Sequence, residues 1–341
     1  MKKIISIVLM TTVLASFTGC ASTSKNTSET SGINTSQATN NNSLPLKGGM
    51  GGGLGGGSVD TSAIKTKYTD IAYGNISKTQ KLDIYLPNEG SGPFPVIVAI
   101  HGGAFKMGNK TGGDVASMID GVNHGYAVVS VDYRLSDEAI FPAAISDVKA
   151  AIRFIKANAK KYNINSDKIA VWGDSAGGNL AALVGTSGDD NTLNGDNKEN
   201  MGYSSSVQAV VDWFGPLDFL KMDEQFKAAG ITPKFGNTSS DTSPESAYIG
   251  GNITKNVEQT KKANPENYIT SKDAYFFIQH GSADQNVPTQ QSINFYEKLK
   301  TVLGKDKVTL TILEGAAHGG AQFESKENIT KVYKFLDNIL K

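Results

Sequence analysis

The sequence is short of cysteine, of net charge and of long apolar runs. Cys20 is the only cysteine among 341 residues, so no disulfide can form within the chain. Lysine plus arginine and aspartate plus glutamate both number 33, and the formal net charge is +0. A protein that binds nucleic acid needs a basic excess to neutralise phosphates, so this composition argues against nucleic acid as a main partner. It does not exclude a neutral substrate.

The first 20 residues are typical of a signal peptide. Lys2 and Lys3 precede an apolar run over residues 4–17, which is too short to cross a bilayer comfortably. Cys20 follows a small glycine, so the segment resembles a bacterial lipoprotein signal, in which the cysteine is lipidated. That resemblance implies a secreted protein anchored to the outer face of a bacterial membrane through Cys20 alone. Ordinary secretion with an incidental cysteine is the alternative.

Residues 21–62 contain few groups that could be buried. They are rich in serine, threonine, asparagine and glycine and include the run GGMGGGLGGGS, so we expect a flexible tether. No apolar strand precedes the glycines and no Gly-Lys-Ser/Thr follows them, so they lack the pattern of a phosphate-binding loop. The folded domain is therefore expected over residues 63–341.

Apolar runs alternate with helical patterns throughout this domain. The run KLDIYLP at 81–87 predicts a half-buried antiparallel strand, whereas the later runs are continuously apolar, as expected for strands covered on both faces. Helices are expected after Pro142, after Ser175 and at the C-terminus. This order predicts an α/β fold, with a mostly parallel central sheet and helices on both faces. The continuous strands are expected at 95–100, 127–131, 169–172, 207–213, 274–279 and 308–313.

Two stretches interrupt the alternation. Residues 187–206 are rich in aspartate, asparagine and glycine and are expected to form a loop. Their spacing misses the EF-hand pattern, so no metal site is predicted there. Residues 218–269 are mostly polar and weakly periodic. Because they separate two core strands, we expect a small cap or lid over the strand ends, where sheets of this class bind ligands.

Residues 168–183, KIAVWGDSAGGNLAAL, combine a buried strand, a sharp turn and a helix. The turn places Ser175 between two glycines at the Gly-x-Ser-x-Gly spacing. A serine at the apex of such a turn has a strained backbone that holds its hydroxyl out at the end of the sheet, and larger flanking residues would clash. We therefore predict that Ser175 is a nucleophile.

A serine nucleophile needs a base, and the base needs an orienting acid. His318 lies in a loop of small residues after the last strand and is the candidate base. Asp284 lies just past the preceding strand and is the candidate acid. The order Ser175, Asp284, His318 is the one that serine hydrolases with a strand–turn–helix elbow use. We expect structural roles for the other histidines, which are His101, His124 and His280.

An oxyanion hole needs backbone amides that approach the reacting carbonyl closely. Gly103 and Ala104 lie in a loop of small residues after the strand at 95–100, and Ala176 follows the nucleophile. We expect these three amides to form the hole.

Seven segments, taken in order, resemble the α/β-hydrolase superfamily. More narrowly, they are similar to the hormone-sensitive-lipase-like esterases and, within that range, to the bifunctional feruloyl and acetyl-xylan esterases. The resemblance covers about residues 67–341. Ala104 stands where lipase-like members often have a third glycine, which favours the carbohydrate esterases. The segments are HGGAF at 101–105, VDYRL at 131–135, FPAAISDVKAAIRFI at 141–155, GDSAGGNLAAL at 173–183, DWFGPLDF at 212–219, HGSADQNVP at 280–288 and EGAAHG at 314–319.

The resemblance implies a serine carboxylesterase that uses no cofactor or metal. It also implies short acyl or aromatic esters as substrates, namely acetyl or feruloyl groups on plant polysaccharide. A general short-chain lipase or esterase of the same fold is one alternative. A non-catalytic binding protein is another, although such proteins usually lose a triad member. Phe105, Trp213 and Phe214 are candidate pocket residues, with plain core packing as the alternative.

Overall fold

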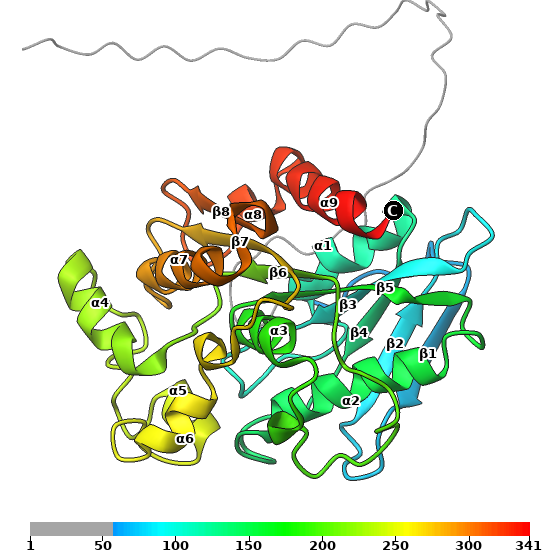
Figure 1. The fold of residues 1–341 in the computed structure, drawn as a ribbon. Helices are drawn as coiled ribbons and strands as arrows, with labels where there is room; N and C mark the ends of the chain where they lie inside the picture. The colour runs from blue at the N-terminus through cyan, green and yellow to red at the C-terminus, as the bar shows by residue number, and fades with distance from the viewer. Residues whose placement is uncertain (1–56) are drawn as a thin grey trace, which may run out of the picture. The chain divides into compact units, whose positions relative to one another are not determined.

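The computed structural model describes residues 57–341 (Figure 1). The expected signal peptide, Cys20 and most of the expected tether lie outside the described residues. The expected end of the tether at residue 62 is wrong, because Ser58 forms a β-bridge with Gly112 and Val59 is buried. None of the helices between residues 57 and 341 is long and apolar enough to cross a membrane.

Eight strands of the described chain form one sheet in the order β1-β2-β4-β3-β5-β6-β7-β8. Strand β2 pairs antiparallel with β1 and with β4, and all neighbours from β4 through β8 are parallel. The predicted mostly parallel sheet is therefore confirmed. The strands are β1 (Lys67–Ala72), β2 (Lys81–Tyr85), β3 (Phe94–Ile100), β4 (Ala127–Val131), β5 (Ile164–Asp174), β6 (Ala209–Trp213), β7 (Tyr275–Gly281) and β8 (Val308–Leu313).

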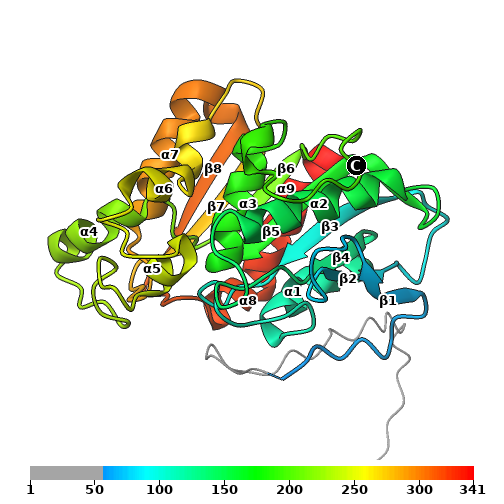
Figure 2. The same cartoon turned by 90° about the horizontal axis from the view of Figure 1, so that it is seen from below.

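Helices cover both faces of the sheet, as Figure 2 shows from below. On one face lie α2 (Ala143–Ala157), α3 (Ala176–Ser187) and α7 (Gln290–Leu303), and on the other lie α1 (Ala116–Ile119) and α9 (Lys326–Leu340). Two separate apolar cores result, one on each side of the sheet. The short helix α8 (Ala321–Glu324) directly precedes α9.

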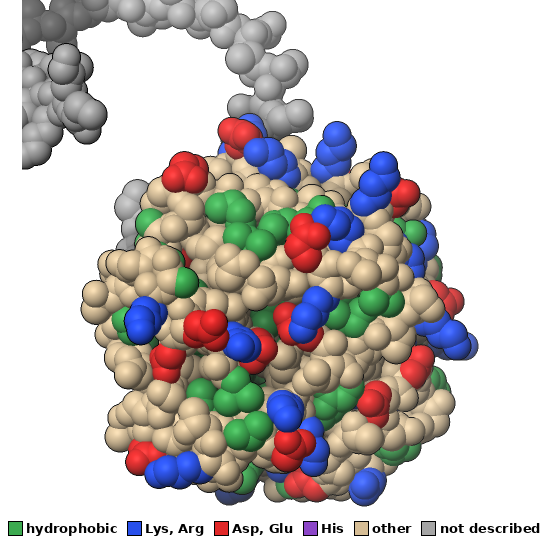
Figure 3. All heavy atoms as spheres, turned by 60° about the vertical axis from the view of Figure 1, so that its left-hand side comes forward, with side chains coloured by type: hydrophobic (Ala, Val, Ile, Leu, Met, Phe, Trp, Pro, Cys, Tyr) green, Lys and Arg blue, Asp and Glu red, His purple; other side chains and the backbone are tan. Residues whose placement is uncertain are grey.

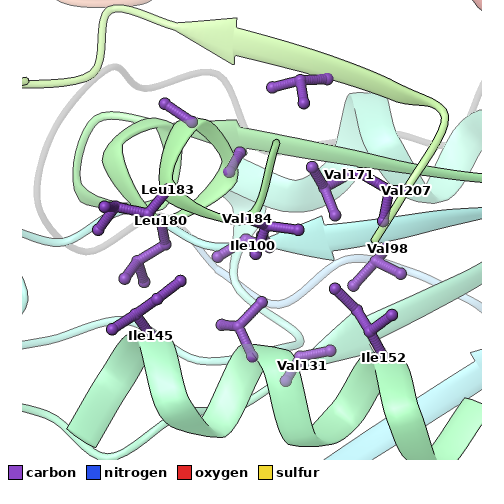
Figure 4. Packing of buried hydrophobic residues seen from close by; sticks show 14 of the residues in the cluster. Val98, Ile100, Val131, Ile145, Ile152, Val171, Leu180, Leu183, Val184 and Val207 are labelled. Carbon is purple, nitrogen blue, oxygen red and sulfur yellow. The ribbon is translucent and has the colours of Figure 1, made fainter. Parts of the chain in front are cut away.

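The larger core lies between the sheet and helices α2 and α3 (Figure 4). Because α2 repeats its apolar residues at helical spacing, one of its faces is fully buried. Each fully buried Leu, Ile or Val side chain contributes about 1.5–3 kcal/mol relative to exposure. The side chains that meet in Figure 4 include Ile145 and Ile152 of α2, Leu180, Leu183 and Val184 of α3, and Val98, Ile100 and Val131 of the sheet.

The antiparallel edge of the sheet differs from expectation in two ways. Strand β1 was not predicted, because five of its six residues are exposed and it therefore carries no apolar pattern. Strand β2 was expected to be half-buried, yet Asp83 and Tyr85 on its second face are also buried. The Asp83 carboxylate is 3.4 Å from the Lys110 ammonium and accepts a hydrogen bond from the Tyr85 hydroxyl at 2.9 Å. This ion pair lets a polar residue occupy a buried position.

Residues 187–206 form the expected loop, which is tied to helix α2 by buried polar groups. Lys149 donates to the carbonyl oxygens of Ser187 and Asp190, both at 2.6 Å. No group of three or more His, Cys, Asp or Glu side chains suited to a metal occurs among residues 57–341. Three polar side chains of the loop bond to side chains outside it: Asn194 to Arg153, Asp196 to Arg134, and Asn197 to Ser146 and Asp147.

The largest buried polar cluster centres on Asp147 of α2, which is 0% exposed. Arg134 donates to both carboxylate oxygens of Asp147, at 2.9 and 2.7 Å, and also pairs with Asp196. Gln80 and Asn197 each donate to Asp147 at 2.8 Å. The cluster therefore joins the turn before β2, the loop after β4, helix α2 and the 187–206 loop.

We expect Arg134→Ala to lower the free energy of unfolding by about 3–5 kcal/mol, because it leaves the buried Asp147 carboxylate without its counter-charge. Urea unfolding followed by circular dichroism measures this. Lys331→Ala is the matched control, since its pair with Glu327 is exposed and should leave the midpoint unchanged. Equal midpoints for the two variants would contradict a stabilising role for the cluster.

Candidate active site

Ser175 lies at the turn between β5 and α3, in a backbone conformation that few residues adopt. Its φ is 52° and its ψ is −118°. A Cβ on Gly173 would lie 2.1 Å from the carbonyl oxygen of Gly177, and a Cβ on Gly177 would lie 2.1 Å from that of Ile100. Since real Cβ atoms do not approach so closely, only glycine fits at either position. The predicted strained turn is therefore present, and steric exclusion of a Cβ explains why Gly173 and Gly177 are glycines.

The structure brings the three predicted triad residues together. The Oγ of Ser175 lies 2.8 Å from Nε2 of His318, and Nδ1 of His318 lies 2.7 Å from Oδ2 of Asp284. The three side chains come from the ends of β5, β7 and β8, which meet at one edge of the sheet because the strands are parallel.

Asp284 is held rigidly as an ionised carboxylate. It is 0% exposed, and its Oδ1 accepts the amides of Asn286 at 2.7 Å and Val287 at 3.0 Å. Burial opposes its ionisation, but the charge of His318 and hydrogen bonds from His280 and His318 hold its pKa well below the usual range. Asp284 therefore keeps Nδ1 of His318 protonated and leaves Nε2 to accept a proton from Ser175.

The loop after β3 presents three consecutive residues in the left-handed region, with φ of 101° at Gly103, 55° at Ala104 and 59° at Phe105. The carbonyl oxygen of Gly103 accepts the amides of Lys106 and Met107, both at 3.0 Å, which closes the loop. The amides of Gly103, Ala104 and Ala176 have no acceptor among residues 57–341. The sequence predicted these three amides as oxyanion donors, and they are free to take that role among the described residues.

Close backbone contact sets this loop beside the nucleophile. Besides the approach of Gly177 to Ile100, a Cβ on Gly102 would lie 2.8 Å from Oδ2 of Asp174. Burial raises the pKa of Asp174 well above its usual range, and the charge of Asp114 raises it further. Asp114 accepts the Gly102 amide at 3.1 Å. The two acidic side chains therefore lie against the start of the loop.

The prediction that Phe105 and Trp213 line the pocket is wrong, because both belong to the protein core. Phe105 is 1% exposed and stacks on Tyr248 with ring centroids 3.9 Å apart. Trp213 is 4% exposed and donates to Gln279 at 2.7 Å. Phe214 is also buried, but its ring centroid lies 4.5 Å from that of His318, so it packs against the imidazole of the triad.

The other histidines make structural contacts. His101 is buried, donates from Nδ1 to the carbonyl oxygen of Gly102 at 2.8 Å and stacks on Tyr133. His124 is partly exposed and stacks on Tyr333. His280 is fully buried within reach of Asp284, a contact that the sequence alone did not indicate.

The insertion over residues 218–269 contains three short α-helices and contacts the loops after β3 and β7. The ring stack of Tyr248 on Phe105 contacts the loop after β3, and the amide of Lys234 donates to Gln285 beside Asp284 at 2.8 Å. Tyr248 was missed because nothing in its local pattern distinguishes it from other aromatic residues. The helices of the insertion are α4 (Met222–Ala229), α5 (Pro244–Ile249) and α6 (Val257–Lys262).

The face that Figure 3 shows carries lysine and arginine side chains interspersed with acidic ones. It therefore presents both signs of charge to an approaching molecule, in line with the balanced composition of the chain.

The strand order, the elbow and the Ser–His–Asp geometry together define an α/β-hydrolase. The chain belongs to the BD-FAE family, whose model matches residues 82–299, more than half of the sequence. This match confirms the resemblance noted in the sequence.

Several characterised proteins are similar to the chain. It is 30% identical to the esterases LipC and LipQ of Mycobacterium tuberculosis, over 73% of its own length in each case. These alignments cover 59% of LipC and 56% of LipQ, so the chain spans little more than half the length of these relatives.

Two solved structures are also similar. A bifunctional GH43-CE protein of Bacteroides eggerthii is 35% identical with a TM-score of 0.72, over 80% of this chain and 35% of that one. A truncated form of a carbohydrate esterase from gut microbiota is 30% identical with a TM-score of 0.74, over 83% of this chain and 99% of that one.

We expect a fluorophosphonate probe to label Ser175, because His318 can take the hydroxyl proton as the phosphorus is attacked. Intact-protein mass spectrometry should show one adduct on the wild-type chain and none on Ser175→Ala. Ser136→Ala is the control, since its hydroxyl is buried without a partner among the described residues. An adduct on Ser175→Ala would place the nucleophile elsewhere.

Proposed function

We propose that this protein is a serine carboxylesterase. The single observation that carries the proposal is the hydrogen-bond chain from Ser175 through His318 to Asp284, with distances of 2.8 and 2.7 Å. A hydroxyl, an imidazole and a buried carboxylate in this arrangement are the groups that acyl transfer requires. The named esterases among the relatives support the same reaction class.

In the first step Oγ of Ser175 attacks the ester carbonyl while Nε2 of His318 takes its proton. Asp284 stabilises the imidazolium that forms. The amides of Gly103, Ala104 and Ala176 donate to the oxyanion, and loss of one such donor typically raises the barrier by about 3 kcal/mol. His318 then protonates the leaving alcohol. Water attacks the acyl-enzyme with His318 again as base, which releases the acid and restores Ser175.

The substrate class that we propose is an acetyl or feruloyl ester on plant polysaccharide. Two observations support it. One structural neighbour is named a carbohydrate esterase and another a bifunctional GH43-CE protein, and Ala104 replaces the third glycine of lipase-like loops. A short-chain esterase without a carbohydrate preference is the competing function, and it is favoured by the names of LipC and LipQ.

A hollow of about 610 Å³ beside the loop after β4 is suited to the sugar side of such a substrate. Its size falls within the usual range of ligand sites. Ile140 on its rim is 50% exposed, and Asp137 and Asp196 supply oxygen atoms that can accept sugar hydroxyls. Its wall residue Phe141 packs on Tyr248, which stacks on Phe105 of the oxyanion loop. In this proposal the hollow holds a sugar unit of the polysaccharide that carries the ester.

The purified enzyme is expected to release acetate from acetylated xylan or ferulate from feruloylated arabinoxylan. Ser175→Ala and His318→Ala should lower kcat/KM by at least about a thousandfold, because the nucleophile or its base is absent. Circular dichroism of the variants checks that the fold is retained. Hydrolysis of long-chain acyl esters alone would overturn the proposed carbohydrate substrate but not the proposed esterase activity.

Ile140→Ser tests whether the hollow binds a sugar unit, independently of the triad chemistry. It is expected to raise KM for acetylated xylan several-fold and to leave cleavage of p-nitrophenyl acetate unchanged, because that ester has no sugar to place in the hollow. Val302→Ser is the matched control, since Val302 is similarly exposed on α7. An unchanged KM for xylan in Ile140→Ser would exclude the hollow as a subsite.

We further propose that the mature protein is a secreted lipoprotein anchored through Cys20, which the pattern of residues 1–20 supports. Cells fed a labelled fatty acid should incorporate it into the wild-type protein and not into Cys20→Ser. Equal labelling of both would refute the anchor.

A further inference from the structure

His280 is the second-last residue of strand β7. It is 0% exposed and makes three polar contacts. Its Nδ1 lies 2.7 Å from Oγ of Ser292 on α7. Its Nε2 lies 3.0 Å from the carbonyl oxygen of Val287 and 3.3 Å from Oδ2 of Asp284. Both ring nitrogens are therefore engaged, and one of them faces the acid of the triad.

The partners of His280 determine where its proton resides. The Val287 carbonyl can only accept, so Nε2 carries a hydrogen. In the neutral ring Nδ1 is then an acceptor, and the Ser292 hydroxyl supplies the matching donor. Ser292 thus holds the ring in the tautomer whose Nε2–H donates to Val287, with Oδ2 of Asp284 3.3 Å from the same nitrogen.

Nε2 of His280 also lies near the carboxylate oxygen that accepts Nδ1 of His318. Oδ2 of Asp284 is 3.3 Å from His280 and 2.7 Å from His318. Two amides donate to Oδ1, so both carboxylate oxygens have polar neighbours. A neutral donor fixes the plane of the carboxylate without cancelling its charge, which His318 needs when it becomes an imidazolium.

One further titratable group faces His280. Asp212 on β6 is fully buried near His280; burial raises its pKa to about 7, and the hydrogen bond from the Gly215 amide acts to lower it. One of its carboxyl oxygens accepts the Gly215 amide at 3.0 Å. The groups around His280 are thus Asp284 from its own loop, Asp212 from the neighbouring strand and the neutral Ser292 from α7.

We propose that His280, oriented by Ser292, is a positioning residue that holds Asp284 in the plane of His318 and sets the basicity of His318. The proposal rests on the esterase function proposed above. Removing the donor makes the Asp284 carboxylate a stronger acceptor for His318, which raises the pKa of His318 and lets Asp284 rotate. Misplacement of a catalytic group by about 1 Å can lower a rate about a hundredfold.

Three variants test the proposal. We expect His280→Leu to lower kcat at least about tenfold with KM within about twofold of the wild type. The acidic limb of kcat/KM should move to higher pH, since the base stays protonated longer. His280→Gln retains an N–H near the position of Nε2 and should restore most of kcat. Ser292→Ala should shift the limb in the same direction by less. His124→Gln is the matched control, because His124 is partly exposed and pairs with Asp120 rather than with Asp284.

Thermal unfolding separates these effects from loss of fold, because a merely structural role would lower stability without moving the pH limb. If His280→Leu does not fold, His280→Gln and Ser292→Ala still decide the question. An unmoved acidic limb and unchanged kcat in folded variants would overturn the proposal. A rise in KM alone would also overturn it.

Nuclear magnetic resonance titration of labelled histidines measures the pKa of His318 without any substrate. A higher pKa in His280→Leu than in the wild type supports the positioning role, and an equal one refutes it. A wild-type protein that cleaves no ester would refute the proposed function alone. The titration would still test the contact between His280 and Asp284.

Discussion

The site depends on one close backbone approach, that of Gly177 at the start of α3 to the carbonyl oxygen of Ile100 at the end of β3. This contact brings the nucleophile turn against the loop that supplies Gly103 and Ala104. It also requires the unusual backbone of Ser175, which costs on the order of 1–3 kcal/mol and is maintained by the packed core beneath it. The parallel sheet provides that support, because β3 and β5 are hydrogen-bonded neighbours.

The same edge of the sheet carries the acid and the base. Asp284 follows β7 and His318 follows β8, and the pairing of these two strands determines how far apart the side chains lie. Asp284 is the most constrained group of the site, because two amides and two imidazoles surround its carboxylate. A charge buried in this way is retained only when it is fully hydrogen-bonded. The rigidity of the triad therefore originates in the β7–α7 loop as much as in His318 itself.

Phe105 and Trp213 form core contacts, and we propose that the insertion and the hollow beside the loop after β4 recognise the substrate instead. Tyr248 connects these two regions, since it packs on both Phe105 and Phe141. A change in the insertion can thus alter the walls of the site without touching the triad, and one family can act on different esters.

The sequence by itself determined the strand–helix alternation, the glycine-flanked Ser175 and the order of Ser175, Asp284 and His318. These features are local: they depend on periodicity, on sterics at a turn and on residues that directly follow apolar runs. Only the tertiary structure decided the features that depend on distant partners. Strand β1 is mostly exposed and has no apolar alternation that would reveal it. Asp83 is buried because Lys110 pairs with it, and Phe105 is buried in a ring stack with Tyr248. The contact of His280 with Asp284 likewise depends on a loop whose shape no spacing in the sequence reveals.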